Sequence, residues 1–279
     1  MPLFSRPDGQ LVANEAPVRR IMPYLMKGRN ESVVLHEARY DLTRTLPWLK
    51  TQQADGHKIT LFHLLLHAIA RTLHERPGLN RFVSGGRCYQ RNGVWMSFAA
   101  KKAFADDAPI VTVKAEFPES DKFADVHGRI AGAVAGARSS DGKKSAVDKE
   151  LALALMLPGP LLSMVMGFLR WLDRVNLMPA AMIKGDPMYA SAFVANLGSI
   201  GISDVYHHLF EYGTVSLFAA VGKVEKMVFV DEETLQPVVR DGVKVCWTFD
   251  ERIHDGFYCA SSLKIAQHIV EDPTKYIVG

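Results

Sequence analysis

Hydrophobic residues recur with a helical period in the segment that follows Thr60. Apolar side chains stand at positions 61, 64, 65, 68, 69 and 73, so one face of this segment is apolar throughout. Thr60 is a suitable N-cap, and Pro77-Gly78 predicts the end of the helix. His63 and His67 lie one turn apart, but no acidic residue completes a metal site with them, so we interpret both as surface residues.

Alternating polar and apolar positions predict strands elsewhere. Residues 110–117 alternate cleanly, and an Asn92-Gly93 turn predicts a hairpin between its two flanking strands. Further strands are predicted at 32–37, 192–196, 215–221, 227–230 and 243–249, with helices at 19–26, 41–50, 119–137 and 256–270. This mixture places the chain in the α/β class, with one domain over 18–279 preceded by an N-terminal arm at 1–17.

A long apolar segment interrupts this pattern. No residue from Leu151 to Leu169 is charged, which approaches the length of a membrane span, but Pro158-Gly159-Pro160 would break a spanning helix. Two shorter helices, about 150–157 and 161–175, are predicted instead. A buried helix or a subunit contact is the favoured interpretation of residues 151–172. The alternatives are an apolar lid, an acyl-chain pocket or a helix at a membrane surface.

Composition narrows the function classes. The 33 Lys and Arg residues nearly balance 30 Asp and Glu residues, and no basic stripe is interleaved with aromatic residues, so nucleic acid is not an expected partner. Cys88, Cys246 and Cys259 are widely spaced, and no Cys/His cluster has metal-ligand spacing, so we expect neither a disulfide framework nor a metal. The N-terminus lacks a basic region followed by an apolar run, which predicts a cytoplasmic protein without a signal peptide.

The most informative motif is Asp250-Glu251-Arg252-Ile253-His254-Asp255-Gly256. It resembles the signature Asp-His-Arg-x-x-Asp-Gly of dihydrolipoamide acyltransferase cores, and the chain is similar to those cores and to chloramphenicol acetyltransferases. Two further blocks stand in the family's order. One is the helix that ends in Pro77-Gly-Leu-Asn80, and the other runs from Phe193 to Gly201 and resembles a strand ending in Ser-Asn-Leu-Gly. Together the blocks cover about residues 18–278.

The resemblance implies a chloramphenicol acetyltransferase-like fold, a two-layer mixed β-sheet covered by helices. It also implies homotrimers with active sites between subunits. In that family a histidine acts as general base on a thiol or hydroxyl, and coenzyme A enters along the interface. An acyl group would therefore arrive as a thioester of coenzyme A or of a carrier. Residues 1–17 are too short for a lipoyl domain, so no covalent lipoyl group is expected, and the apolar tail at 276–278 allows assembly beyond the trimer.

The sequence departs from the family pattern at the two positions where the family has its catalytic histidine and its oxyanion-stabilising serine. Glu251 stands where the family has its histidine, and Ala195 stands where it has the serine that stabilises the oxyanion. A glutamate acts as a base near pH 7 only when burial raises its pKa. An alanine side chain cannot donate to an oxyanion, although a backbone N–H can. Ala195 begins the predicted substrate-binding set, which continues with Asn196, Gly198 and Ser199.

Three interpretations of the motif stay open. Glu251 is the base, His254 is a displaced base, or the protein is a non-catalytic trimeric scaffold or ligand-binding core that has lost its base. In an extended segment, His254 would lie on the opposite face from Glu251, whereas a bend could bring the two together as a Glu–His pair. Asp255 completes the candidate catalytic set. In the family this aspartate is structural and pairs with an arginine, for which the candidates here are Arg19, Arg20 and Arg29.

Overall fold

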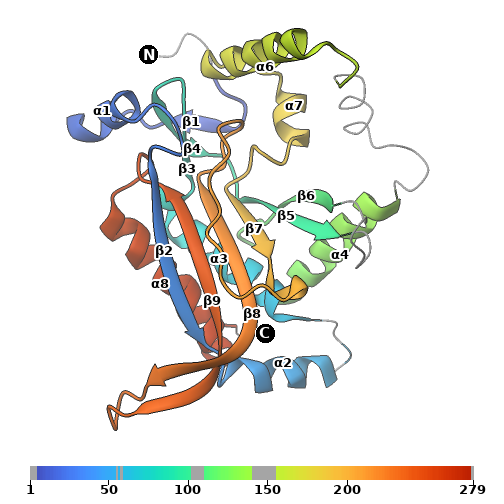
Figure 1. Cartoon of the computed structure of the whole chain (residues 1–279), viewed down its shortest axis with the longest axis vertical. Coiled ribbons are helices and arrows are strands. Elements are labelled where there is room, and N and C mark those ends of the chain that lie inside the picture. The colour runs from blue at the N-terminus through green and yellow to red at the C-terminus, as the bar shows by residue number, and fades with distance from the viewer. Residues whose placement is uncertain (1–4, 55, 57–58, 102–109, 140–154, 278–279) are drawn as a thin grey trace.

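The structure, a computed structural model, describes residues 5–54, 56, 59–101, 110–139 and 155–277 (Figure 1). The strands in this part of the chain are β1 (Gly9–Leu11), β2 (Val33–Asp41), β3 (Arg81–Ser84), β4 (Arg87–Arg91), β5 (Trp95–Lys101), β6 (Ile110–Glu116), β7 (Ala192–Asn196), β8 (Leu217–Val230) and β9 (Pro237–Asp250). The helices are α1 (Pro17–Leu25), α2 (Thr45–Ala54), α3 (Leu61–Glu75), α4 (Phe123–Ser139), α6 (Gly159–Arg174), α7 (Ala180–Gly185), α8 (Gly256–Glu271) and α9 (Pro273–Tyr276).

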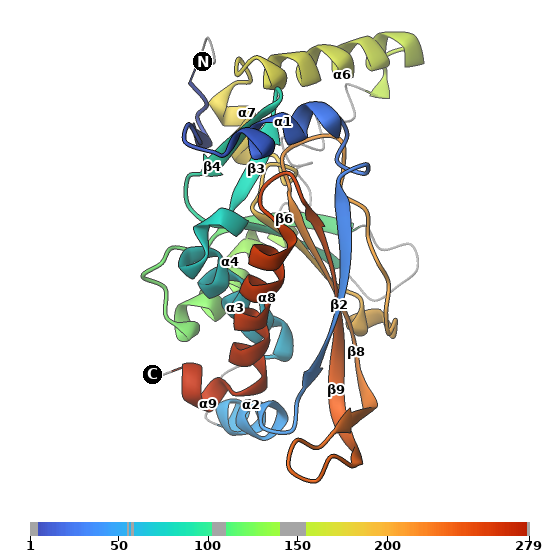
Figure 2. The same cartoon turned by 90° about the vertical axis from the view of Figure 1, so that its left-hand side faces the viewer.

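Six strands form one mixed sheet in the order β2-β9-β8-β7-β5-β6. β7 runs parallel to both β5 and β8, whereas the other neighbours are antiparallel. β8 and β9 continue beyond the sheet as a projecting two-stranded hairpin (Figures 1 and 2). The predicted mixed sheet covered by helices is confirmed, and the strands predicted at 215–221 and 227–230 are one continuous strand.

One face of the sheet is closed by helices. α3, α4 and α8 lie along it, as Figure 2 shows from the side, and the main hydrophobic core fills the space between them and the sheet. From β9, Val245, Trp247 and Phe249 point into this core because alternate residues of a strand share a face. α3 begins where the sequence predicts, with Thr60 and His63 forming a reciprocal capping box.

His67 differs from its predicted surface position. Only 7 % of it is exposed, and its ring lies edge-on to Phe123 at 5.4 Å. α4 covers this side of α3, which the helical pattern of α3 alone does not reveal. Burial lowers the pKa of His67 to about 4, and the neighbouring Arg71 acts in the same direction.

The opposite face of the sheet is covered by one extended segment of the chain, and we call it the segment-covered face. Residues 202–216 run across it without regular secondary structure and pack on Phe193, Phe218 and Ala220. The His207 ring stacks on Phe218, with ring centroids 4.0 Å apart. This single covering segment leaves apolar side chains exposed along the same face, among them Leu35, Val205 and Tyr206.

The predicted hairpin at Asn92-Gly93 is wrong. β4 and β5 flank this turn but belong to different sheets, since β4 pairs with β1 and β3 in a small three-stranded sheet. The hairpin turn lies instead at Gly85-Gly86, between β3 and β4. Both glycines have positive φ, as a two-residue hairpin loop requires, and the backbone of Arg174 leaves no room for a side chain at Gly85.

α6 is an exposed helix, so the interpretation of this segment as a helix buried within its own chain is wrong. None of its residues is buried, and Met164, Phe168 and Trp171 lie on its exposed apolar side. The helix predicted at 150–157 falls mostly outside the described residues. Among the helices that the structure describes, none has the length and hydrophobicity needed to cross a membrane.

Both ends of the described chain are fastened to the domain. Within the predicted N-terminal arm, β1 pairs with β4, and the buried Arg6 forms ion pairs with Asp8 and Asp173, each at 2.8 Å. Near the C-terminus, Ile277 packs against the main core. The described part of the apolar tail therefore contacts its own subunit.

Candidate functional site

A buried ion pair anchors the turn that follows β9. Arg252 reaches back to Asp250 through Nε and Nη2, at 2.8 and 2.7 Å, and both residues are buried. Ser32, which lies just before β2, donates to the same carboxylate at 3.0 Å. The third guanidinium nitrogen of Arg252, Nη1, donates to the carbonyl of Met26 at 3.0 Å. Both charges are thus paired and hydrogen-bonded, which offsets the cost of removing them from water.

Glu251 is held at this turn through its backbone. Its N–H donates to the carbonyl of Ser32 at 3.0 Å, and its carbonyl accepts from Nη2 of Arg19 at 2.8 Å. The side chain is half-buried, and no hydrogen bond or ion pair reaches its carboxylate from the described part of the chain. The structure therefore positions the backbone of Glu251 and leaves its carboxylate without an orienting partner.

His254 and Asp255 form a close pair at the start of α8. Nδ1 of His254 lies 2.9 Å from Oδ2 of Asp255 and 3.0 Å from the Asp255 backbone nitrogen. One ring nitrogen cannot donate and accept at once, and the carboxylate is the stronger partner, so we assign the proton to Nδ1. The imidazole also stacks on Tyr258, with ring centroids 3.7 Å apart. Its side chain is 26 % exposed.

The environment sets the charge state of this pair. Burial lowers the pKa of His254, although the neighbouring Asp255 acts in the opposite direction. The backbone N–H of Tyr258 lowers the pKa of Asp255, whose side chain caps α8 through this bond at 2.8 Å. A neutral imidazole beside an ionised carboxylate is the arrangement expected near pH 7.

The expected pairing of Asp255 with an arginine is wrong. Within the described residues its ion pair is with His254, and the aspartate that binds an arginine is Asp250. Among the candidate partners, Arg19 donates to the Glu251 carbonyl, and Arg29 donates to backbone carbonyls. Residues 251–254 form a turn, so the extended alternative for Glu251 and His254 does not hold, and the ion pair that His254 makes in the described structure is with Asp255 and not with Glu251.

The predicted substrate-binding residues form a second compact turn at the end of β7. Asn196 accepts a hydrogen bond from the Ser199 backbone N–H at 3.3 Å, while the Ser199 hydroxyl donates to the Asn196 carbonyl at 2.7 Å. Gly198 lies so close to β8 that a Cβ there would be 2.4 Å from the carbonyl oxygen of Gly222. Ala195, half-buried on β7, packs against the segment-covered face of the sheet.

The two turns lie far apart within one chain. Ala195 is opposite Ala220, which is opposite Cys246, and Glu251 follows Cys246 by five residues. Strands rise by roughly 3.3 Å per residue and lie about 4.8 Å apart, so the two positions are separated by on the order of 15–20 Å. A single subunit therefore does not bring Glu251 or His254 together with Ala195.

Sequence reasoning did not assign to the first turn the residues that hold it, namely Asp250, Arg252, Ser32 and Arg19. Asp250 and Arg252 flank Glu251 in the same motif, so their spacing carried a signal. Ser32 comes from a distant segment and carried no signal, and Arg19 was a candidate partner of Asp255 but donates to the Glu251 carbonyl instead. Among the described residues, no group of three or more His, Cys, Asp or Glu side chains is placed to hold a metal ion.

Comparisons with known proteins identify the fold. No protein-family model matches the sequence, and no curated protein matches it. A probable dihydrolipoamide acetyltransferase from Listeria monocytogenes is similar in structure, with 16 % identity, a TM-score of 0.61 and 95 % of each chain covered. The dihydrolipoamide acetyltransferase of Azotobacter vinelandii is 18 % identical, with a TM-score of 0.60 over 95 % of this chain and 94 % of its own. A chloramphenicol acetyltransferase is 13 % identical, with a TM-score of 0.53 over 95 % and 98 %. The chain has the fold of these acyltransferase cores.

Proposed function

We propose that this chain, which has the fold of dihydrolipoamide acetyltransferase cores, transfers an acyl group from a thioester to a thiol or hydroxyl, with His254 as general base. The observation that carries this proposal is the 2.9 Å contact between His254 Nδ1 and the Asp255 carboxylate. With its proton on Nδ1, the imidazole keeps a lone pair on Nε2. A carboxylate that fixes the tautomer in this way supports a histidine base in acyl transfer.

Nε2 of His254 takes the proton of the acceptor thiol or hydroxyl while the sulfur or oxygen attacks the thioester carbonyl. The tetrahedral intermediate then expels the thiolate of the donor, which takes the proton back from the imidazolium. Burial lowers the pKa of His254 and so favours the neutral form that can accept this proton. The donor in this proposal is a thioester of coenzyme A or of a carrier.

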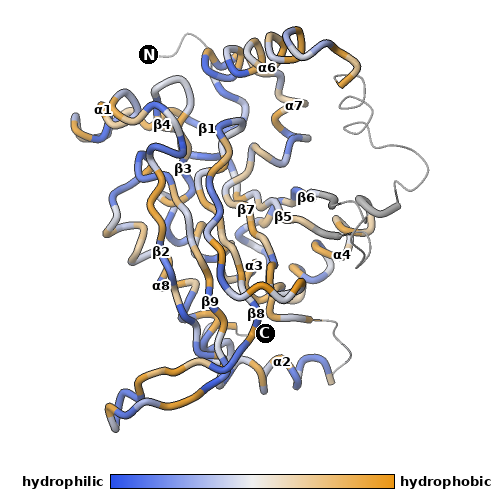
Figure 3. Tube along the Cα trace, viewed as in Figure 1, coloured by the Kyte–Doolittle hydropathy of each residue, from blue (hydrophilic) through white to orange (hydrophobic). Residues whose placement is uncertain are grey.

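The proposed active site lies between two subunits of a homotrimer. The distance between the His254 turn and the Ala195 turn within one chain supports this arrangement. Leu35, Val205 and Tyr206 expose apolar surface on the segment-covered face of the sheet. Figure 3 shows further apolar positions on the projecting hairpin, where Val228 and Val239 are exposed. Exposed apolar side chains gathered in this way are typical of subunit contacts. One structurally similar protein forms the cubic core of the pyruvate dehydrogenase multienzyme complex. The proposal therefore includes assemblies of several trimers.

Release of free thiol from a panel of acyl-coenzyme A thioesters, with thiol and hydroxyl acceptors, tests this function. The matched variants are His254→Gln and Glu251→Gln, which alter neighbouring positions of the same turn. Loss of a general base costs typically a hundredfold or more, so we expect His254→Gln to lose about that factor in kcat. Glu251→Gln is expected to stay within about threefold of the unaltered protein. Equal turnover by the protein and its His254→Gln variant would refute the assignment.

A non-catalytic trimeric scaffold or ligand-binding core is the second candidate. The observation in its favour is that Ala195 provides no side-chain donor and the Glu251 carboxylate has no orienting partner in the described structure. In the Azotobacter enzyme, a serine, a histidine and an asparagine were investigated for roles in catalysis, and the last two are spaced as Glu251 and Asp255 are here. Thioester binding with no turnover for any acceptor supports this second candidate.

A further inference from the structure

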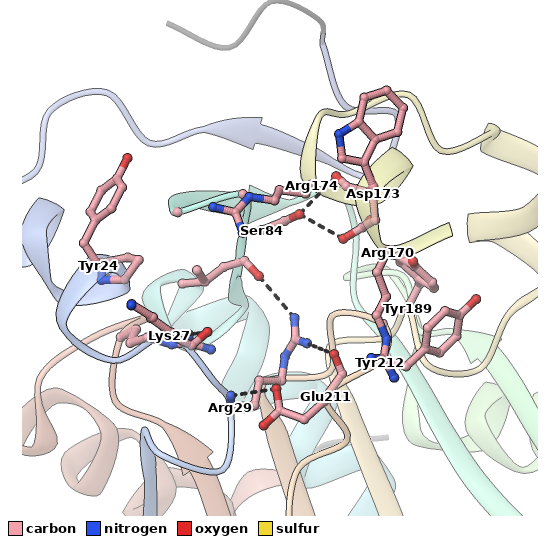
Figure 4. Close-up of a pocket in the computed structure, with 17 residues that line it drawn as sticks. Tyr24, Lys27, Arg29, Ser84, Arg170, Asp173, Arg174, Tyr189, Glu211 and Tyr212 are labelled. Atoms are coloured by element: carbon pink, nitrogen blue, oxygen red, sulfur yellow. Dashed lines mark hydrogen bonds between the residues drawn. The ribbon is translucent and has the colours of Figure 1, made fainter. Parts of the chain in front are cut away.

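A cavity of about 560 Å³ lies between α1, the β3–β4 turn and the last turn of α6. Tyr24 and Lys27 border it from the α1 side, and Arg170 and Tyr212 border it from the other (Figure 4). Arg29 lies at its floor. None of Glu251, His254 and Ala195 lines the cavity, so it is distinct from the proposed acyl-transfer site.

The lining of this cavity is basic. It contains Lys27, Arg29, Arg170, Arg174 and Arg252, against only two acidic residues, Asp173 and Glu211. Arg252 is neutralised by Asp250. Within the described residues no carboxylate side chain pairs with Lys27, Arg170 or Arg174. Arg174 also offsets the negative end of the α6 dipole, because it lies in the last turn of that helix.

The two acidic residues are already engaged. The Asp173 carboxylate accepts from Arg6 at 2.8 Å and from the Ser84 hydroxyl at 2.9 Å. The Glu211 carboxylate accepts from the backbone N–H groups of Arg29 and Asn30, and these bonds hold its pKa low although burial opposes them. Neither carboxylate approaches the Arg29 guanidinium closely enough for an ion pair.

Arg29 is the unusual cation of the group. It is only 7 % exposed, and its guanidinium donates to the carbonyls of Glu211 and Val83, each at 3.1 Å. Its Nε is buried and has no hydrogen-bond partner in the described structure. Burial lowers the pKa of this arginine. A buried guanidinium that is hydrogen-bonded to neutral carbonyls and has no ion-pair partner is costly, and the charge of an anion in the cavity would offset part of that cost.

We propose that this cavity is a binding site for the oxyanion group, phosphate or carboxylate, of a small molecule. Arg29 forms its charged floor, and Lys27 and Arg174 close over the anion from the rim. The rings of Tyr24 and Trp171, both exposed at the rim, contact the remainder of the ligand. Arginine suits this role because its planar group of donors matches the oxygens of phosphate and carboxylate.

The test is a titration with inorganic phosphate, and separately with acetate, at constant ionic strength, followed by the fluorescence of Trp171. Trp171→Phe assigns the signal. The double variant Lys27→Gln/Arg174→Gln removes rim charges from exposed positions, and Lys264→Gln on α8 is the matched control outside the cavity. We expect saturable binding that the double variant weakens at least about tenfold and the control leaves unchanged, since each lost charge-assisted bond is worth that much or more.

Arg29→Gln is expected to abolish the saturable signal, and its circular dichroism and urea midpoint report whether it folds. Saturation by phosphate alone or by acetate alone supports the site and identifies its anion. Titrations that do not saturate, or a Lys264→Gln loss equal to that of the double variant, would overturn the proposal. Because no acyl thioester is present, the result does not depend on acyl transfer.

Discussion

The two faces of the six-stranded sheet are closed by different means. On one face, α3, α4 and α8 bury a continuous apolar core against the sheet. On the other, a single extended segment covers a smaller cluster and leaves apolar side chains exposed. The first face is complete within one chain. The second face is only partly covered within one chain. It carries the exposed surface that we propose for subunit contact.

Removing a large side chain from the helix-covered face is expected to have the largest effect. Trp247 is fully buried there, and Trp247→Ala should lower the free energy of unfolding by about 3–5 kcal/mol, through lost burial and the cavity it leaves. Urea denaturation at several protein concentrations measures this loss. If the helix-covered face is complete in each subunit, the loss is the same at every concentration. A loss that grows on dilution would contradict this difference between the faces.

Breaking the ion pair at the end of β9 should cost less. Arg252→Met leaves the Asp250 carboxylate buried without its guanidinium, at about 3 kcal/mol, because Ser32 and a backbone N–H still donate to that carboxylate. Thermal or urea unfolding gives the value. The double variant Arg252→Met/Asp250→Asn should recover part of the loss, and a double variant as unstable as the single one would argue against a charge effect.

Acidification should weaken the helix-covered face through His67. Its folded pKa of about 4 lies below the ordinary value of 6.5, so the unfolded chain binds the extra proton between these values. The stabilisation is complete above pH 6.5 and is lost as the pH falls toward 4. Between pH 7 and pH 5 we expect a loss of about 1–2 kcal/mol in the free energy of unfolding.

His67→Leu should remove most of the pH dependence that His67 contributes to the free energy of unfolding, since leucine does not titrate. Urea midpoints of the unaltered protein and of His67→Leu, measured at pH 7 and at pH 5, show how much of the pH dependence is lost. His63 on the same helix also has its pKa lowered, to about 4, by burial and by His127, so part of the dependence remains in the variant. An unchanged pH slope would show that His67 accepts its proton without cost.

A charge on the exposed part of the second face should have the smallest effect on the folding of each chain. Leu35 is exposed on β2, so Leu35→Asp should change the unfolding free energy of a single subunit by no more than about 0.5 kcal/mol. The same change is expected to dissociate the proposed trimer. Sedimentation or light scattering at micromolar concentration reads this out, and a protein that is monomeric before substitution would end the subunit-contact proposal.

Local patterns predicted the elements that one segment can encode. α3 and β6 follow from periodicity, α8 and β7 lie where the sequence predicts a helix and a strand, and Thr60 caps α3 as expected. The same patterns did not reveal that α4 buries His67, because burial depends on a segment more than fifty residues away. The prediction of a hairpin at Asn92-Gly93 was wrong for a related reason. A turn sequence bends the chain, but strand pairing decides whether the flanking strands share a sheet.

The sequence by itself determined the motif from Asp250 to Gly256, the order of the helices and strands, and the mixed α/β class. These are local properties, set by side-chain period and backbone preference. Only the tertiary structure decided that Asp250 pairs with Arg252 and that Asp255 pairs with His254. It also decided that Ala195 lies far from both pairs. The basic cavity around Arg29 also exists only after folding. Charge pairing and burial join residues that are distant in sequence, so no single segment encodes them.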